Sequence, residues 1–255
     1  RPPRSTLFPY TTLFRSTARK DFEERLNWDI WLDKSNKIIE QLASEHQPDF
    51  YLPVYVINMR ERVERKQHIT KEFDNKEEFE LNWVEASAHP IGAVGLWNSM
   101  IKIIKMAKEK GDDIIVICED DHYFTENYSP KLLFKEVTEA YIQGAEVLSG
   151  GIGGFGQAIP AGYHRYKVDW FWCTQFIVIY NRFFDKMLDY SFQNTDTADG
   201  VISKLATNIM VIYPFISEQK DFGYSDVTQS NMGQQGKIRE HFARANKHMK
   251  SISLK

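Results

Sequence analysis

The sequence has few of the residues that define several protein classes. Two cysteines, Cys118 and Cys173, occur in 255 residues, which excludes a disulfide scaffold and favours reduced thiols in a cytoplasmic compartment. No run reaches the ~18–20 apolar residues that cross a bilayer. Cations are not in excess, because 32 Lys and Arg stand against 35 Asp and Glu. A nucleic acid is therefore not an expected partner. The 42% hydrophobic content fits one globular core.

The N-terminal segment divides into two parts. Residues 6–16 read TLFPYTTLFRS, which resembles the in-frame translation of a common sequencing adaptor. We therefore expect residues 1–16 to be a non-native artefact and exclude them from the fold. Residues 17–50 mix charged and apolar residues at helical spacing, which predicts a helical lead segment.

Short apolar runs alternate with segments of helical periodicity over residues 51–235. Gly111 stands where a helix C-cap is expected, and Pro214 follows the last apolar run. The pattern predicts an α/β fold with a mixed, mostly parallel sheet and helices on both faces. The predicted strands are 52–59, 79–83, 114–118, 171–180 and 209–213, and the predicted helices are 60–73, 97–107, 132–141 and 182–190.

Three consecutive acids, Glu119, Asp120 and Asp121, directly follow the apolar run 114–118. Ligands of α/β sheets bind at the carboxyl ends of strands. Three adjacent carboxylates repel one another, so solvent, a basic residue or a divalent cation must compensate them. Carboxylate oxygens are the ligands that Mg2+ and Mn2+ prefer, which favours a cation site. The alternative is a solvated turn with a helix N-cap.

The segment Ser149–Gly156 contains five glycines in eight residues. Such a segment permits close approach of the backbone to a ligand, or a mobile flap. A plain flexible loop is the alternative. A nucleotide-binding phosphate loop is excluded, because no Lys-Ser or Lys-Thr pair follows the glycines.

The order and spacing of several motifs resemble glycosyltransferase family 25, which includes lipooligosaccharide and collagen galactosyltransferases. Three positions depart from the family pattern: Met100 replaces a His, His122 an apolar residue and Gln175 a small residue. These departures leave open a divergent subfamily with another sugar. The matching residues are Val56–Asn58 followed by Glu64–Ile69, Ser99 ahead of Glu119–Asp121, Thr174–Ile179, Asp199, Pro214, Gln219, Ser225 and Asp226.

The resemblance implies a GT-A-type, Rossmann-like fold and inverting transfer of a sugar from a nucleotide donor, typically a UDP-sugar. A bound Mn2+ or Mg2+ then stabilises the departing diphosphate. We assign Glu119 and Asp121 to the metal or its water shell, and Asp120 to the donor ribose or to the metal as a third ligand. The expected reaction is metal-dependent transfer of a hexose, galactose or similar, to a surface glycan or glycolipid, as in lipopolysaccharide biosynthesis.

Inverting transfer needs a base that takes the proton of the acceptor hydroxyl. Asp199 is the first candidate and Asp196 the second. The alternative for both is capping of a helix that carries Val201, Ile202 and Leu205.

Four residues are expected to bind the donor. Arg60 and Arg65 follow the first predicted strand and suit the diphosphate, whereas Asn58 suits the base or ribose. Ser99 joins them through the family resemblance. A solvated helix face is the alternative for the arginines.

Trp172 and Thr174 are expected to bind the acceptor. The ring of Trp172 offers a platform for the apolar face of a sugar, and burial in the core is the alternative.

The segment 236–255 forms a basic tail. From Lys237 onward, six Lys or Arg stand against Glu240 alone. Anionic lipids attract such clusters, so we expect peripheral contact with the inner face of the membrane. A frayed, solvated terminus is the alternative.

Two other functions stay open on the sequence. A nucleotidyltransferase shares the acidic metal site on an α/β sheet. A non-catalytic, glycosyltransferase-like binding module is the second alternative, motivated by Met100 and Gln175.

Overall fold

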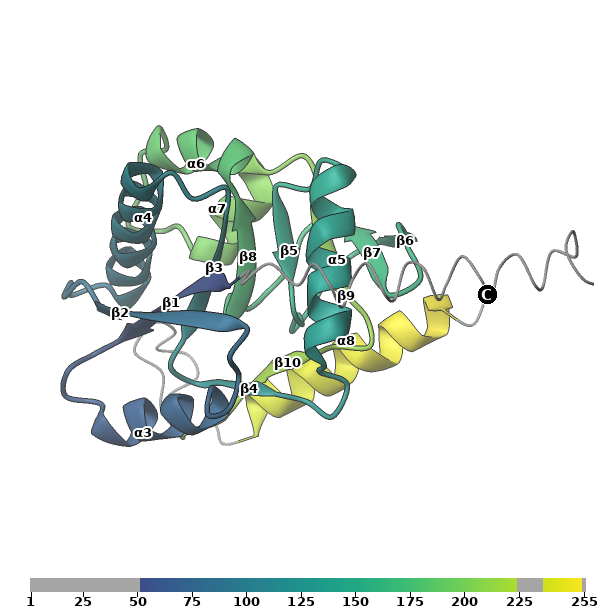
Figure 1. Ribbon diagram of the computed structural model, residues 1–255, viewed down its shortest axis with the longest axis horizontal. Coiled ribbons are helices and arrows are strands. Elements are labelled where there is room, and N and C mark those ends of the chain that lie inside the picture. Colours follow the sequence, from purple (N-terminus) through teal and green to yellow (C-terminus); the bar gives the residue numbers. More distant parts are fainter. Residues whose placement is uncertain (1–50, 224–235, 254–255) are drawn as a thin grey trace, which may run out of the picture. The chain divides into compact units, whose positions relative to one another are not determined.

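The computed structural model describes residues 51–223 and 236–253 (Figure 1). The expected artefact over residues 1–16 and the helical lead over 17–50 lie outside these described residues, as do Ser225 and Asp226.

The core of the described chain is an eight-stranded sheet with the order β2-β1-β3-β8-β5-β9-β7-β6. β1 pairs in parallel with β2 and β3, and β5 with β9, whereas β8, β7 and β6 make antiparallel pairs. The sheet is therefore mixed, and the α/β class expected from the sequence is confirmed. The strands are β1 (Leu52–Asn58), β2 (Phe79–Glu85), β3 (Ile114–Glu119), β5 (Val147–Ser149), β6 (Ala158–Pro160), β7 (Arg165–Val168), β8 (Phe176–Tyr180) and β9 (Ile209–Ile212).

Two hydrophobic cores lie on the two faces of this sheet. Ile115 and Ile117 of β3 belong to one core, and Val116 and Cys118 to the other. Burial on both faces explains why the central strands read as continuous apolar runs. On the first face pack α4 (Gly92–Lys110), α6 (Asn181–Leu188), α7 (Ala198–Leu205) and α8 (Lys237–Ser253), and on the second α3 (Val63–Glu72) and α5 (Pro130–Ile142).

Local signals in the sequence set several of these boundaries. Gly111 ends α4 with φ of 77°, as expected for a left-handed C-cap. The Ser129 hydroxyl accepts a hydrogen bond from the N–H of Leu132 (3.2 Å), and Pro130 follows it at the start of α5.

The strand predicted over 171–180 is wrong in its first half, because β8 covers only Phe176–Tyr180. Cys173 has φ of 77°, in the left-handed region that a strand residue does not occupy. Residues 171–175 therefore precede the strand, which begins at Phe176. A second, two-stranded antiparallel sheet of β4 (His122–Phe124) and β10 (Ser217–Gln219) was not anticipated.

The basic C-terminal segment forms α8 over Lys237–Ser253. Phe242, Ala245 and Met249 of α8 are buried in the core that also holds α4. The helix is therefore packed over this range, in contrast to a frayed terminus. Its exposed cations are Arg239, Arg244, Lys247 and Lys250.

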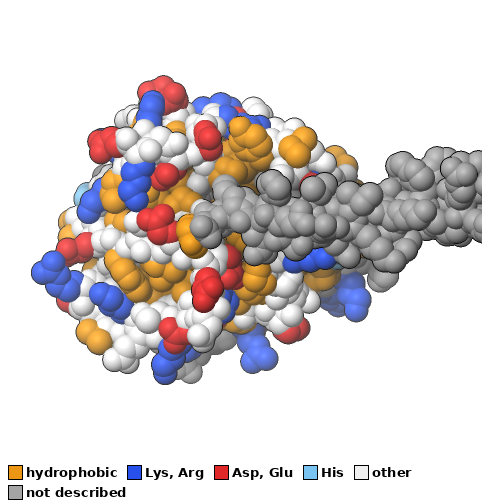
Figure 2. All heavy atoms as spheres, viewed as in Figure 1, with side chains coloured by type: hydrophobic (Ala, Val, Ile, Leu, Met, Phe, Trp, Pro, Cys, Tyr) orange, Lys and Arg blue, Asp and Glu red, His pale blue; other side chains and the backbone are white. Residues whose placement is uncertain are grey.

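The described surface has mixed charge on the face drawn in Figure 2, where Lys and Arg side chains are interspersed with Asp and Glu side chains. None of the helices in the described ranges has the length and apolar character needed to cross a bilayer.

Candidate active site

A cleft of about 940 Å3 opens where β1 and β3 end. Carboxyl ends of neighbouring parallel strands meet at one edge of a sheet, which is the usual ligand position in α/β folds. The segments that line the cleft are Ile57 and Met59, Arg65, residues 86–93 with Gly95 and Leu96, Glu119–Asp121, Trp172–Thr174, Asn194–Asp199, Gln219, and Lys237, Ile238 and His241 of α8.

Asp120 is held by two buried donors. The Asn58 side-chain amide donates to its Oδ2 (2.7 Å), and Arg65 Nη1 donates to its Oδ1 (2.9 Å). Arg65 Nη1 also donates to Oδ2 of Asp121 (3.2 Å). A basic residue therefore compensates two of the three adjacent acids. Buried ion pairs are stable when further hydrogen bonds satisfy them, and Asn58 supplies one.

Of the two carboxylate oxygens of Asp121, only Oδ2 has hydrogen-bond partners in the described chain. Its Oδ2 accepts a hydrogen bond from the Gln219 side-chain amide (2.8 Å), and its backbone carbonyl accepts from the N–H of Lys220 (2.7 Å). Its Oδ1 is buried and has no hydrogen-bond partner in the described chain. Burial raises the pKa of Asp121 to about 6, although the nearby Arg65 opposes the rise. Of the carboxylate oxygens that line the cleft in the described chain, this is the one that is buried without a hydrogen-bond partner.

Glu119 lies beside Asp121 at the end of β3. The Thr174 hydroxyl donates to its Oε1 (2.6 Å). Burial raises the pKa of Glu119 to about 8, and the charge of Asp121 adds to the rise while the Thr174 hydrogen bond opposes it. An ionised Glu119 at neutral pH is therefore unfavourable unless a cation joins it.

The chemistry of these donors fits a cation shared with a substrate. Among the described residues, no three His, Cys, Asp or Glu side chains are arranged as a metal cage. Mg2+ is commonly bound by one or two carboxylates together with substrate phosphates and water. Glu119 and the partnerless Oδ1 of Asp121 are carboxylate donors of this kind, so their chemistry fits Mg2+ or Mn2+.

Asp199 lies in the first turn of α7 and lines the cleft. Its Oδ1 accepts from the N–H of Gly200 (2.8 Å), and its Oδ2 accepts from the N–H of Cys173 (3.2 Å). The N-cap of α7 is Thr197. Asp199 is therefore oriented toward the segment that carries Trp172 and Thr174.

Asp196 also lines the cleft, but its Oδ2 accepts hydrogen bonds from the Tyr190 hydroxyl (3.1 Å) and the N–H of Gln193 (2.8 Å). These bonds hold the loop ahead of α7.

The two residues expected at the acceptor lie together in the cleft. Trp172 lines the cleft and is 47% exposed, so a ligand can reach its ring. Thr174 also lines the cleft, and its hydroxyl donates to Glu119.

Three of the residues expected at the donor do not line the cleft. Asn58 supports Asp120 from behind, and Arg60 is exposed and forms an ion pair with Glu85 (3.0 Å). Ser99 is fully buried inside α4, where its hydroxyl donates to the carbonyl of Gly95 (2.8 Å) and accepts from the N–H of Ser87 (2.8 Å). Ser99 therefore fixes the 87–95 wall of the cleft, and its hydroxyl is not part of the cleft surface.

Met100, His122 and Gln175 are buried, and within the described chain none of them lines the cleft. Met100 is fully buried in the core of α4. His122 shares a hydrogen bond with the Ser217 hydroxyl (2.8 Å), and burial lowers its pKa well below the usual value. The Gln175 amide donates to the carbonyl of Gly151 (3.0 Å). The three residues therefore contribute to the interior of the protein and do not form the surface of the cleft.

Sequence reasoning assigned no site role to Gln219, Lys237 or His241, which all line the cleft. Gln219 is far from Asp121 in the chain and reaches it only through β10. Lys237 and His241 are four residues apart, which places two residues on the same face of a helix. This spacing was the signal in the sequence that could have placed them together.

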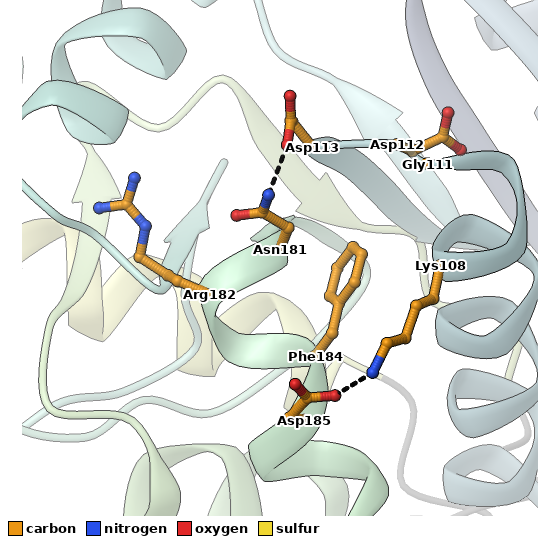
Figure 3. A pocket seen from close by; sticks show the side chains of 8 residues that line it. All are labelled: Lys108, Gly111, Asp112, Asp113, Asn181, Arg182, Phe184 and Asp185. Atoms are coloured by element: carbon orange, nitrogen blue, oxygen red, sulfur yellow. Dashed lines mark hydrogen bonds and ion pairs between the residues drawn. The ribbon is translucent and has the colours of Figure 1, made fainter.

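A second cavity of about 450 Å3 lies at the other end of β3 (Figure 3). In this cavity the Asn181 amide donates to Asp113, and Lys108 forms an ion pair with Asp185. It is separate from the three acids, which lie at the carboxyl end of β3.

No family model and no curated protein sequence matches the chain. Solved structures that it resembles include UDP-glucose pyrophosphorylase without ligand (10% identity, 77% of this chain and 82% of that one, TM-score 0.42) and the same enzyme in complex with UDP-glucose (9%, 78% and 81%, TM-score 0.42). Another is a glycosyltransferase involved in glycosylation of the major capsid of PBCV-1 (12%, 79% and 99%, TM-score 0.41).

Proposed function

We propose that this chain is a Mn2+- or Mg2+-dependent, inverting glycosyltransferase similar to family 25. It transfers a hexose, galactose or similar, from a UDP-sugar to a surface glycan or glycolipid. The observation that carries the proposal is the buried, partnerless Oδ1 of Asp121 beside Glu119, at the end of a strand and in an open cleft. We also propose that the protein works at the cytoplasmic face of the membrane, where the exposed cations of α8 contact anionic lipid.

The charge of the cleft supports a metal requirement. Five lining residues are acids, namely Glu119, Asp120, Asp121, Asp196 and Asp199. Arg65 is already engaged by Asp120 and Asp121. A diphosphate placed beside Glu119, Asp120 and Asp121 would meet repulsion, so at this end of the cleft it must enter with a cation.

The chain's own residues then divide the work. Glu119 and Asp121 hold the cation, which when bound neutralises charge on the leaving diphosphate. Asp120 remains fixed by Asn58 and Arg65 and contacts the donor from the floor of the cleft. Asp199 takes the proton of the acceptor hydroxyl, with its carboxylate oriented by the N–H groups of Cys173 and Gly200.

The test measures release of UDP from UDP-galactose and UDP-glucose by the full chain, with glycan acceptors and with Mn2+, Mg2+ or chelator. We expect Asp121→Asn to lower kcat/KM at least ~100-fold and to abolish the response to Mn2+. Asp199→Asn should lower kcat by about 100-fold or more and leave UDP affinity within twofold. Asp185→Asn, in the second cavity, is the matched control and should retain full activity.

Three results would contradict the proposal. Full activity in chelator, or an Asp121→Asn variant that still responds to Mn2+, overturns the metal assignment. Release of pyrophosphate from UTP and a sugar phosphate identifies a nucleotidyltransferase. Retained anomeric configuration in the product, measured by NMR, excludes an inverting mechanism.

A further inference from the structure

The glycine-rich segment Ser149–Gly156 has a role that the proposed chemistry does not use. None of its residues, all of them described, lines the cleft. The segment instead binds the backbone of Trp172, because the N–H of Gly153 donates to the Trp172 carbonyl (2.9 Å) and the N–H of Trp172 donates to the Gly154 carbonyl (3.1 Å). The Trp172 backbone is therefore fixed on both sides.

The missing side chains in this segment make room for the indole ring. A Cβ atom at Gly154 would lie 2.7 Å from Cε3 of Trp172, and one at Gly153 would lie 2.7 Å from Sγ of Cys173. Real Cβ atoms essentially never make contacts that short, so a side chain at Gly154 would displace the Trp172 ring and one at Gly153 would displace the Cys173 side chain. The ring of Trp172 thus rests directly on the loop backbone while the residue stays 47% exposed.

The N-terminal part of α8 completes this wall of the cleft. The rings of Trp172 and His241 meet edge to face, with centroids 5.7 Å apart. Lys237 lies one helical turn before His241 and lines the same cleft. The wall therefore presents an aromatic face, an imidazole and an ammonium group together.

The charges of this wall differ from those of the rest of the cleft. No carboxylate in the described ranges forms an ion pair with Lys237. Burial, together with the charges of Arg244 and Lys237, lowers the pKa of His241 although Glu240 opposes the shift, which favours the neutral imidazole, a group that can both donate and accept hydrogen bonds. A cation beside a half-exposed indole suits a sugar that carries a negative group.

We propose that Trp172, His241 and Lys237 form the acceptor subsite and that the acceptor is an acidic saccharide, whose carboxylate or phosphate pairs with Lys237. The sugar ring lies on the indole and His241 hydrogen-bonds its hydroxyl groups. This inference rests on the proposed function, because it divides the cleft between a donor held at Glu119 and Asp121 and an acceptor held at α8.

The experiment is an NMR titration of the full chain with matched probes, in the presence and absence of UDP and Mg2+. The carboxylate pair is 3′-sialyllactose against lactose, and the phosphate pair is galactose 6-phosphate against galactose. We expect at least one acidic probe to bind about tenfold more tightly than its neutral partner, with the difference shrinking as salt rises. Which pair shows the difference identifies the anionic group.

Two variants locate the effect. Lys237→Gln should remove the preference for the acidic probe and leave the neutral probe unchanged, whereas Lys247→Gln, on the exposed side of α8, should keep the preference. Gly154→Ala, which displaces the Trp172 ring, should weaken acidic and neutral probes alike.

Several outcomes overturn the inference without touching the proposed function. Equal binding of acidic and neutral probes removes the charge assignment, and so does an unchanged preference in Lys237→Gln. Weaker binding of UDP with Mg2+ in Lys237→Gln would place α8 at the donor. Failure of the parent protein to bind UDP with Mg2+ counts against the proposed function itself, whichever sugar binds.

Discussion

Several buried ionic side chains of the described chain are paired with oppositely charged groups or hydrogen-bond donors. The partners differ from one side chain to the next. Arg165 is fully buried and pairs with Glu136 and with Glu139 (3.3 Å). Burial raises the pKa of Glu136, although the charge of Arg165 opposes the rise. Arg65 stands between Asp120 and Asp121 in the same manner. Removing one partner of such a pair costs about 3–5 kcal/mol, because the other charge stays buried.

Glu146 gives the clearest dependence of stability on pH. Its Oε1 accepts from Lys186 Nζ (2.6 Å), and its Oε2 accepts from the N–H of Thr207 (2.6 Å). Burial acts to raise the pKa of Glu146, but these hydrogen bonds outweigh it and the pKa is lowered. The stabilisation is therefore present above the ordinary pKa of ~4.3 and is lost as the pH falls through the lowered value.

We predict that Glu146→Gln lowers the free energy of unfolding by about 1 kcal/mol at pH 7. The loss should shrink toward zero as the pH falls through the lowered pKa of Glu146, because the parent glutamate then becomes protonated as well. Urea unfolding at several pH values measures it, with the exposed Glu109→Gln as control. A loss that stays constant from pH 7 down to the onset of acid unfolding would show that the charge of Glu146 is not involved.

At the site, the sequence could indicate which residues meet but not what each one touches. Asn58 is the last residue of β1 and Asp120 directly follows the neighbouring parallel strand β3, so their proximity could be predicted once these strands are paired. Arg65 is on a helix after β1, and nothing in its spacing shows that its charge faces two aspartates. The cleft position of His241 depends on the packing of α8, which only the folded chain reveals.

At the scale of elements, long periodic segments were predicted well and short ones were not. The predicted helices correspond to α3, α4, α5 and α6, since each carries two or more turns of apolar spacing. Four of the strands have only three residues each, which is too few to show an alternation of apolar and polar side chains. These strands are β4, β5, β6 and β10. β8 begins later than the predicted 171–180 strand because Cys173 has a left-handed backbone conformation. A cysteine at that position gives no sign of this conformation in the sequence.

The glycine-rich segment joins the two sheets of the fold. The carbonyl of Gly150 accepts from the N–H groups of Ile216 (2.8 Å) and Ser217 (3.1 Å), next to β10. A Cβ atom at Gly151 would lie 1.9 Å from the backbone carbonyl oxygen of Ser217, and no side-chain rotation can relieve that contact. Gly151 is therefore required by its neighbour's backbone.

We predict that Gly151→Ala lowers the free energy of unfolding by about 2–3 kcal/mol, since the backbone must move to accept it. Gly144→Ala is the matched control, because Gly144 has φ of 74° but its nearest neighbour is a side-chain atom of Arg182 at 3.4 Å. Backbone strain alone should cost the control about 1 kcal/mol. Chemical denaturation ranks the two, and a smaller effect at Gly151 than at Gly144 would contradict the close approach.

At the scale of the whole described unit, stability concentrates in the middle of the sheet. β8 lies between β3 and β5, and all its residues from Phe176 to Tyr180 are buried. They alternate between the two cores, so losing β8 exposes both faces at once. β6 is one of the two edge strands of the eight-stranded sheet, and Ile159 on it is 63% exposed. The two strands should therefore open by different routes.

We predict that amide hydrogens of β8 exchange with solvent only through global unfolding, with a free energy and a urea dependence equal to those of the whole unit. The amide of Ile159 should exchange at least ~100-fold faster, through local opening that leaves the core intact. Native-state hydrogen exchange by NMR at increasing urea separates these routes. Exchange of β8 that is insensitive to urea would mean that the strand opens locally, and the two cores would then unfold independently instead of being coupled through the strand they share.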